Sequence, residues 1–133
     1  MGCGSANAIK IKEVSLAPSQ VDLRFMDGTS GAVEFLLLDY RGDAVDLSED
    51  DVVFSIKESI GGLLRLQKTN HPEDHSDAVD GRTRFDIDTG DIALGTTVET
   101  TWVYEVRRIE ATPSTNEAVH IIGKFFIDPA IGV

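Results

Sequence analysis

The sequence predicts an all-β fold, a sandwich of two sheets with about seven to eight antiparallel strands and an N-terminal arm. Apolar and polar residues alternate with a period of two through most of the 133 residues, and helical spacing is hard to find over any long window. Turn-forming dipeptides separate the alternating runs. With 41% hydrophobic and 26% charged residues, the chain has the composition of a globular domain large enough to bury its own core.

The first half of the chain holds four of these runs. The first alternates isoleucine with lysine until Pro18, and the second stops at the tight turn around Gly28. The third is apolar on both faces, which is typical of a central strand, and in the fourth the apolar residues around Phe54 share one face. Between them, the turn at Gly42 and Asp-Leu-Ser at 46–48 indicate a crossing from one layer to the other. The expected strands cover residues 8–16, 21–25, 33–39 and 51–58.

The second half continues the pattern after Gly61-Gly62 interrupts it. Residues 70–81 have no apolar period, so we expect an exposed loop there. Trp102 belongs to an aromatic row that is typical of a core. Gly123 lies inside an apolar run and indicates a bulge or a close backbone approach. The expected strands cover residues 63–68, 82–88, 100–110 and 118–127.

No internal repeat, linker or low-complexity segment divides the chain. Only the N-terminal residues could form a separate unit, because their two short runs precede the region of dense strand signals. We therefore expect an N-terminal arm with one or two short strands over residues 1–30, and a sandwich domain over residues 31–133.

The charge balance argues against nucleic acid and membranes as partners. Twelve Lys and Arg against 23 Asp and Glu give a net charge of -11, which repels nucleic-acid phosphates and anionic membrane surfaces. The single cysteine, Cys3, can form no intrachain disulfide, as in a protein made in a reducing cytosol. Because neither a signal peptide nor a long apolar run is recognisable, we expect a soluble product of the cytoplasm.

Two histidines could form a metal site. His71 and His75 have H-x3-H spacing, and the acidic residues around them could supply further ligands. Pro72 argues against a helix that would place both imidazoles on one face, and an exposed acidic loop without metal explains the residues better. His120 is expected on the strand face that also carries Ile122, Lys124 and Phe126, where a cross-strand or interface packing role is favoured because no motif places a nucleophile beside it. We expect no catalytic residue, no metal and no cofactor.

Several strands carry apolar side chains on both faces, although a sandwich strand needs only one apolar face. The second row marks an oligomer or assembly interface, or alternatively central strands that loops cover. The arm has an apolar set of its own, which could add a strand to a neighbour or wrap around it. The expected interface residues are Ile9, Ile11, Val14 and Leu16 in the arm, and Val53, Val103, Ile122 and Phe126 in the sandwich.

From Phe35 onward, strands and the turns that lead into them follow one another in a fixed order. They are the turn at Gly42, Val-Asp-Leu-Ser at 45–48, Val-Val-Phe-Ser-Ile at 52–56, Gly81 with Arg-Phe-Asp-Ile at 84–87, Trp-Val-Tyr-Glu-Val at 102–106, and the strand at 120–127 with its interior glycine. This order resembles the immunoglobulin-like domain of the phage upper baseplate protein N-terminal family, which occurs in tail, baseplate and fibre proteins of tailed phages.

The resemblance implies an immunoglobulin-like sandwich with a structural role. In that family the domain is a building block of the virion without enzymatic residues, so we expect a non-enzymatic adaptor or assembly component of the tail, baseplate or fibre attachment region. Its partners would be other virion structural proteins and further copies of the chain, as a homo-oligomer within the particle. Its location would be the virion, after synthesis in the host cytoplasm. The alternatives are a capsid decoration protein, or a carbohydrate-binding module with Trp102 or Tyr104 as a stacking platform.

Overall fold

The computed structural model describes residues 19–39, 41–88, 90–92, 94–95, 98–111 and 117–129. These residues form strands and one short 3-10 helix, η2 (Pro72–Asp74), with no α-helix among them, so the prediction of an all-β fold is confirmed. Within the same ranges, no helix has the length and hydropathy needed to cross a membrane. The strands are β2 (Ser19–Gln20), β3 (Leu23–Met26), β4 (Gly31–Leu36), β5 (Asp51–Lys57), β6 (Leu64–Asn70), β7 (Arg82–Ile87), β8 (Thr100–Ile109) and β9 (Glu117–Asp128).

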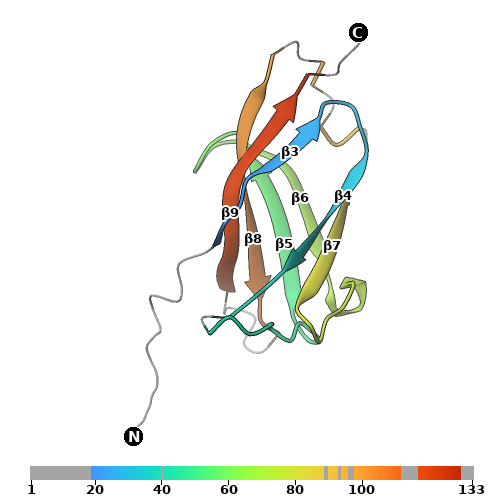
Figure 1. The fold of residues 1–133 in the computed structure, drawn as a ribbon, viewed down its shortest axis with the longest axis vertical. Helices are drawn as coiled ribbons and strands as arrows, with labels where there is room; N and C mark the ends of the chain where they lie inside the picture. The colour runs from blue at the N-terminus through green and yellow to red at the C-terminus, as the bar shows by residue number, and fades with distance from the viewer. Residues whose placement is uncertain are drawn as a thin grey trace, which may run out of the picture.

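The strands form two sheets that face each other (Figure 1). The main sheet has the order β9, β8, β5 and β6, with β2 and β3 both paired to the outer edge of β9. The second sheet consists of β4 and β7, which pair antiparallel. Because β4 and β5 belong to different sheets, the predicted crossing at Gly42 and residues 46–48 is confirmed.

The core lies between the two sheets. Phe54 of β5 is fully buried, and its ring centroid lies 5.5 Å from that of Phe35 and 5.3 Å from that of Phe85 in the opposite sheet. Tyr104 of β8 packs on the same group, with its centroid 5.8 Å from that of Phe54. Alternation along each strand produces this layer, since every second residue points inward. The other fully buried hydrophobic residues are Leu37, Leu47, Val52, Ile56, Ile87, Val106, Phe125 and Ile127.

The expectation that all strands run antiparallel is wrong for β2 and β3. Both run parallel to β9, with Ser19 opposite Ile121 and Phe25 opposite Ile127. Parallel neighbours need a long connection between them, and here almost the whole chain separates the two strands. The period-two pattern specifies which face a residue occupies but not the direction of the neighbouring strand, so the sequence could not reveal this pairing. Residues 19–30 of the expected arm thus contribute two strands to the main sheet.

Gly123 lies where the predicted close backbone approach occurs. A Cβ atom at this position would lie 1.8 Å from the carbonyl oxygen of Val21, so only glycine fits. The same carbonyl accepts a hydrogen bond of 2.5 Å from the Tyr104 hydroxyl, and burial raises the pKa of Tyr104 to about 12. The link between β2 and β3 is therefore held close to Gly123 of β9 and to the Tyr104 side chain.

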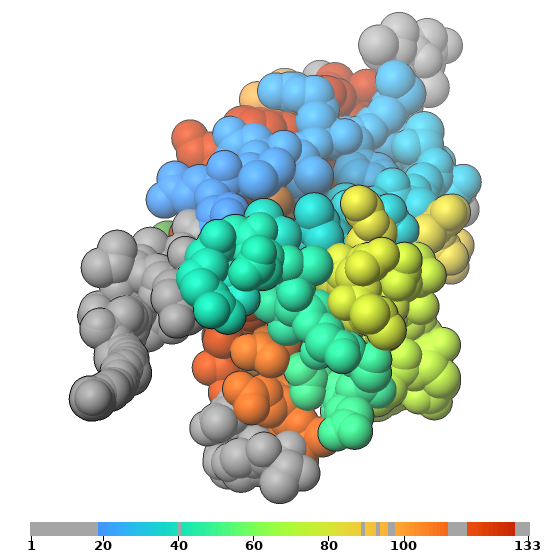
Figure 2. Space-filling model, turned by 60° about the horizontal axis from the view of Figure 1, so that its bottom comes forward, coloured from blue at the N-terminus to red at the C-terminus, as the bar shows by residue number. Residues whose placement is uncertain are grey.

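The connection between β4 and β5 closes one end of the two layers. Figure 2 looks onto this end and shows the connection, in teal and green, lying beside the yellow segment that precedes β7. The backbone N–H of Leu37 donates to the carbonyl of Gly81 at 2.8 Å, and the N–H of Leu47 donates to that of Ala78 at 2.8 Å. Gly81 has a φ of 73°, and a Cβ there would lie 2.7 Å from the carbonyl oxygen of Leu37. Glycine is thus required for this closure.

Candidate assembly interface

The outer face of the main sheet is the side turned away from β4 and β7. Residues that alternate with the core residues of β5, β8 and β9 point to this side, since side-chain direction reverses at each residue. The strand registers bring them together: Val53 pairs with Arg107, Lys57 with Val103, and Val103 with Lys124. The row consists of Val53, Ser55, Lys57, Val103, Glu105, Arg107, Ile122, Lys124 and Phe126.

A hollow of about 640 Å³ lies on this face, and we call it the outer-face groove. Its floor is formed by β5, β8 and β9, and Gln20 and Asp22 form one wall. The opposite wall is Ile60 and Gly61, from the hairpin between β5 and β6 that bends toward β8 and β9 (Figure 1). A second hollow of about 500 Å³ adjoins it, since Ser55, Lys57 and Glu105 line both. The residues that line the groove are Gln20, Asp22, Ser55, Lys57, Ile60, Gly61, Val103, Tyr104, Glu105, Ile122, Gly123 and Lys124.

The groove combines half-buried apolar side chains with lysines. Val103 and Ile122 provide the apolar surface, and both are only partly buried. Lys57 and Lys124 make no ion pair with any residue that the structure describes. The groove lining holds these two lysines together with Asp22 and Glu105, so an anionic group on an occupant is favoured where it lies beside a lysine.

Several other polar groups of the face are hydrogen-bonded, and Asp22 accepts a bond of 3.0 Å from the backbone N–H of Lys124. The carboxylate of Glu105 lies 2.7 Å from Arg107, which also binds Glu117 at 2.9 Å. The Ser55 hydroxyl accepts a hydrogen bond of 3.1 Å from the Gln67 amide. Among its described lining residues, the groove has no histidine or cysteine.

The structure brings the predicted interface residues of the sandwich onto one face. Val53, Val103 and Ile122 line the two adjoining hollows. Phe126 lies farther along β9, where the Arg24 guanidinium covers its ring at 4.6 Å from the centroid. Ile9, Ile11, Val14 and Leu16 lie outside the described residues, so their role in an interface stays a prediction.

The tip of the β5–β6 hairpin, residues 58–63, is a part of this site that sequence reasoning missed. Ile60 is 93% exposed, and Leu63 is exposed as well. The turn is defined by hydrogen bonds, because the N–H of Gly62 donates to Ser59 at 2.8 Å and that of Glu58 donates to Leu63 at 2.9 Å. The available signal was an isoleucine directly before two glycines, a position where a turn leaves a side chain nothing to pack against.

The structure gives His71 and His75 separate partners. Both ring nitrogens of His75 are engaged, Nδ1 with the Thr83 hydroxyl at 2.9 Å and Nε2 with the Asp50 carbonyl at 2.8 Å. His71 lies 3.2 Å from Asp51, and this hydrogen bond raises the pKa of His71. Among the described residues, no group of three or more histidine, cysteine or acidic side chains is placed to hold a metal ion. The two imidazoles therefore hold the segment that contains η2 against β5 and β7.

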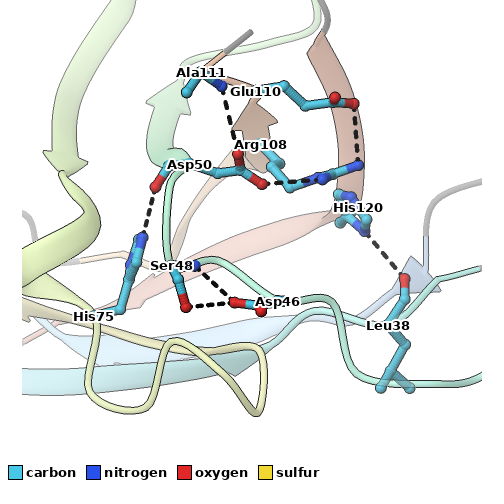
Figure 3. Close-up of polar contacts among 9 residues, drawn as sticks. All are labelled: Leu38, Asp46, Ser48, Asp50, His75, Arg108, Glu110, Ala111 and His120. Atoms are coloured by element: carbon cyan, nitrogen blue, oxygen red, sulfur yellow. Dashed lines mark hydrogen bonds and ion pairs between the residues drawn. The ribbon is translucent and has the colours of Figure 1, made fainter.

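His120 does not share the outer face with Ile122 and Lys124, as its position in the sequence suggested. Ile121 pairs with Val106 and Val119 pairs with Arg107, so His120 is the extra residue of a β-bulge. Its Nδ1 lies 3.1 Å from the carbonyl oxygen of Leu38 (Figure 3). The bulge turns the imidazole away from the groove and toward the connection between β4 and β5.

Around His120, the inner face ends in a polar cluster (Figure 3). Arg108 extends between Asp50 at 3.1 Å and Glu110 at 3.5 Å. Burial lowers the pKa of His120, and the positive charge of Arg108 lowers it further. The Nε atom of Arg108 and the Nε2 atom of His120 are buried without a hydrogen-bond partner among the described residues. Neutral His120 thus fits this position better than its charged form.

No family model matches the sequence of this chain, and no curated protein matches it either.

Proposed function

We propose that the chain is a non-enzymatic structural protein of a tailed-phage virion, an adaptor or assembly component of the tail, baseplate or fibre attachment region. The observation that carries the proposal is the outer-face groove, where apolar side chains, and lysines that form no ion pair with the described residues, lie beside an exposed apolar hairpin tip. A surface of this composition is typical of a protein contact.

The strand order supports an immunoglobulin-like domain. In such sandwiches, strands C, F and G lie in one sheet, and strands B and E lie in the other. In this chain β5, β8 and β9 lie side by side in one sheet, as strands C, F and G would, and β4 pairs with β7 in the other, as strands B and E would. β6 lies beside β5, where the variable type of the fold adds a strand.

The tailed-phage assignment rests on the sequence motifs of the upper baseplate family. The strand motifs fall on β5, β7, β8 and β9, which enclose the core, and the motifs at Gly42 and residues 45–48 lie in the connection between β4 and β5. Because the resemblance lies in core strands, it supports the fold more directly than the function. We infer the role in a virion from the fold and the contact surface together.

A carbohydrate-binding module is less well supported. Trp102 and Tyr104 are only 8% and 3% exposed, and the Arg65 guanidinium lies 4.9 Å from the centroid of the Trp102 ring. A sugar needs an accessible ring face on which to stack, and neither side chain offers one. A capsid decoration protein would use the same outer face, so its position in the particle distinguishes it from a tail component.

The proposal is tested by locating the chain in purified phage particles. We expect mass spectrometry to detect it as a stoichiometric component and immunogold labelling to place it on the tail or baseplate. Gold label over the capsid shell would indicate a capsid decoration protein and not a tail component. Absence from purified particles would refute a virion role altogether.

The contribution of the arm is tested by deletion of residues 1–16. We expect the shortened chain to keep its melting temperature. In the described part of the chain, every core residue lies after residue 19, so the deletion removes none of them. We also expect it to be lost from particles, because the arm is predicted to add a strand to a neighbour. If the shortened chain were incorporated into particles as well as the full chain, the arm hypothesis would be refuted, but the virion role would not.

A further inference from the structure

The hairpin tip lies next to the outer-face groove, but its side chain does not fill the groove. Ile60 forms part of the groove wall, yet its side chain is 93% exposed. Hydrogen bonds within the turn hold the tip in a defined shape, so Ile60 projects from a fixed position. One face of the chain therefore carries both an apolar projection and an apolar hollow.

We propose that the outer-face groove is a self-association site, in which the Ile60 tip of a second copy of this chain occupies the hollow. A two-fold axis would let each copy give one tip and receive one, so the contact closes as a dimer and does not extend into a filament. The inference rests on the proposed function only in taking this face as the contact surface. It adds the identity of the partner and the residue that docks.

The charges of the face suit such an exchange. The net charge of -11 makes two copies repel each other over most of their surface, whereas Lys57 and Lys124 at the groove are unpaired among the described residues. An arriving tip brings Glu58 at its base. Glu58 is paired at 3.1 Å with Arg65 of its own chain, but both side chains are well exposed, so this carboxylate can turn to a lysine at little cost.

The first experiment measures self-association of the full chain by sedimentation equilibrium over a wide concentration range. We expect a reversible dimer, and Ile60→Lys should weaken it by at least about tenfold in Kd, because it removes the apolar tip and brings a positive charge toward Lys57 and Lys124. Val79→Lys is the matched control, since Val79 is also an exposed aliphatic residue, at 65%, but lies in the loop before β7. It should leave the dimer unchanged. Circular dichroism checks that both variants fold.

The second experiment tests docking in trans. In a Cys3→Ser background, chains with Ile60→Cys are mixed with differently tagged chains that carry Val103→Cys, and mild oxidation follows. We expect a disulfide-linked heterodimer, because the tip of one copy would reach the groove floor of the other. Pairing Ile60→Cys with Val79→Cys should give none.

Three results would overturn the inference: a wild-type chain that stays monomeric at every concentration, a dimer that Ile60→Lys does not weaken, or no heterodimer with Val103→Cys. Each leaves the virion role intact, since that role is decided by the presence of the chain in purified particles. Conversely, a dimer that depends on Ile60 in a chain absent from particles would support the contact and refute the proposed function.

Discussion

The two faces of the main sheet are made by the same strands but have different composition. On β5, Phe54 and its inward neighbours are fully buried, whereas Val53 and Lys57 on the opposite side stay partly exposed. The inner face excludes water completely, so it supplies most of the stability of the fold. The outer face keeps apolar surface and charge in contact with solvent. The difference shows that one period-two pattern can encode a core and a contact surface at once.

The largest expected effect comes from truncating the inner face. Phe54→Ala removes a ring that packs against Phe35, Phe85 and Tyr104, and should lower the free energy of unfolding by about 3–5 kcal/mol. Val53→Ala, one residue away on the outer face, should lower it by about 1 kcal/mol or less. Urea denaturation of both variants measures the contrast. Similar losses would mean that the outer face is buried in the isolated chain.

A smaller effect is expected where the inner face ends at β9. Gly123→Ala places a Cβ against the Val21 carbonyl, so it should displace the β2–β3 segment and cost about 1–3 kcal/mol of stability. Gly90→Ala is the control, since no atom lies within 4 Å of its Cβ position. Denaturation midpoints of the two variants are compared. A Gly123→Ala variant as stable as the control would show that the β2–β3 segment can move away from Gly123 at no cost.

The smallest effect concerns the polar end of the inner face. The pKa of His120 is lowered in the folded state, so the stability that its neutral form contributes is present above the usual histidine pKa of about 6.5. It is lost as the pH falls through the lowered folded-state pKa. Lowering the pH from about 7.5 to about 5.5 should therefore reduce the urea midpoint, and His120→Asn should diminish that reduction.

His71 provides a control of opposite sign. Its bond to Asp51 raises its pKa, so its contribution is present below about 6.5 and is lost as the pH rises through the raised folded-state pKa. His71→Asn should therefore enlarge the loss of stability in acid. If His120→Asn kept the full response of the wild type, the acid sensitivity would come from another group.

The sequence predicted those features that depend on local alternation. Val52, Phe54 and Ile56 on one side of β5, and Thr83, Phe85 and Ile87 on one side of β7, lie buried as the pattern required. The same alternation placed Val53, Val103 and Ile122 together on the outer face. Such features are predictable because the period of a strand is a property of its own backbone.

Features that join distant segments could not be predicted. The buried Asp27 accepts hydrogen bonds from the backbone N–H groups of Leu94 at 2.7 Å and Gly95 at 2.8 Å, although its Asp-Gly context indicated only a turn. The bulge at His120 likewise arises from the pairing of β8 with β9, and neither strand carries a sequence pattern that predicts it. The hairpin tip was missed for another reason: an exposed isoleucine fits no rule that places apolar residues inside.

The parallel pairing of β3 with β9 has a mechanical consequence. A force applied between the chain before Ser19 and the chain after Asp128 pulls these two strands in opposite directions along their common axis. From Leu23 opposite Phe125 to Met26 opposite Asp128, the inter-strand hydrogen bonds lie across the line of force. They would have to break together, whereas the bonds of a hairpin pulled apart at its open end break one after another. A domain that transmits tension between neighbours along this line would resist rupture far better than its thermodynamic stability alone suggests.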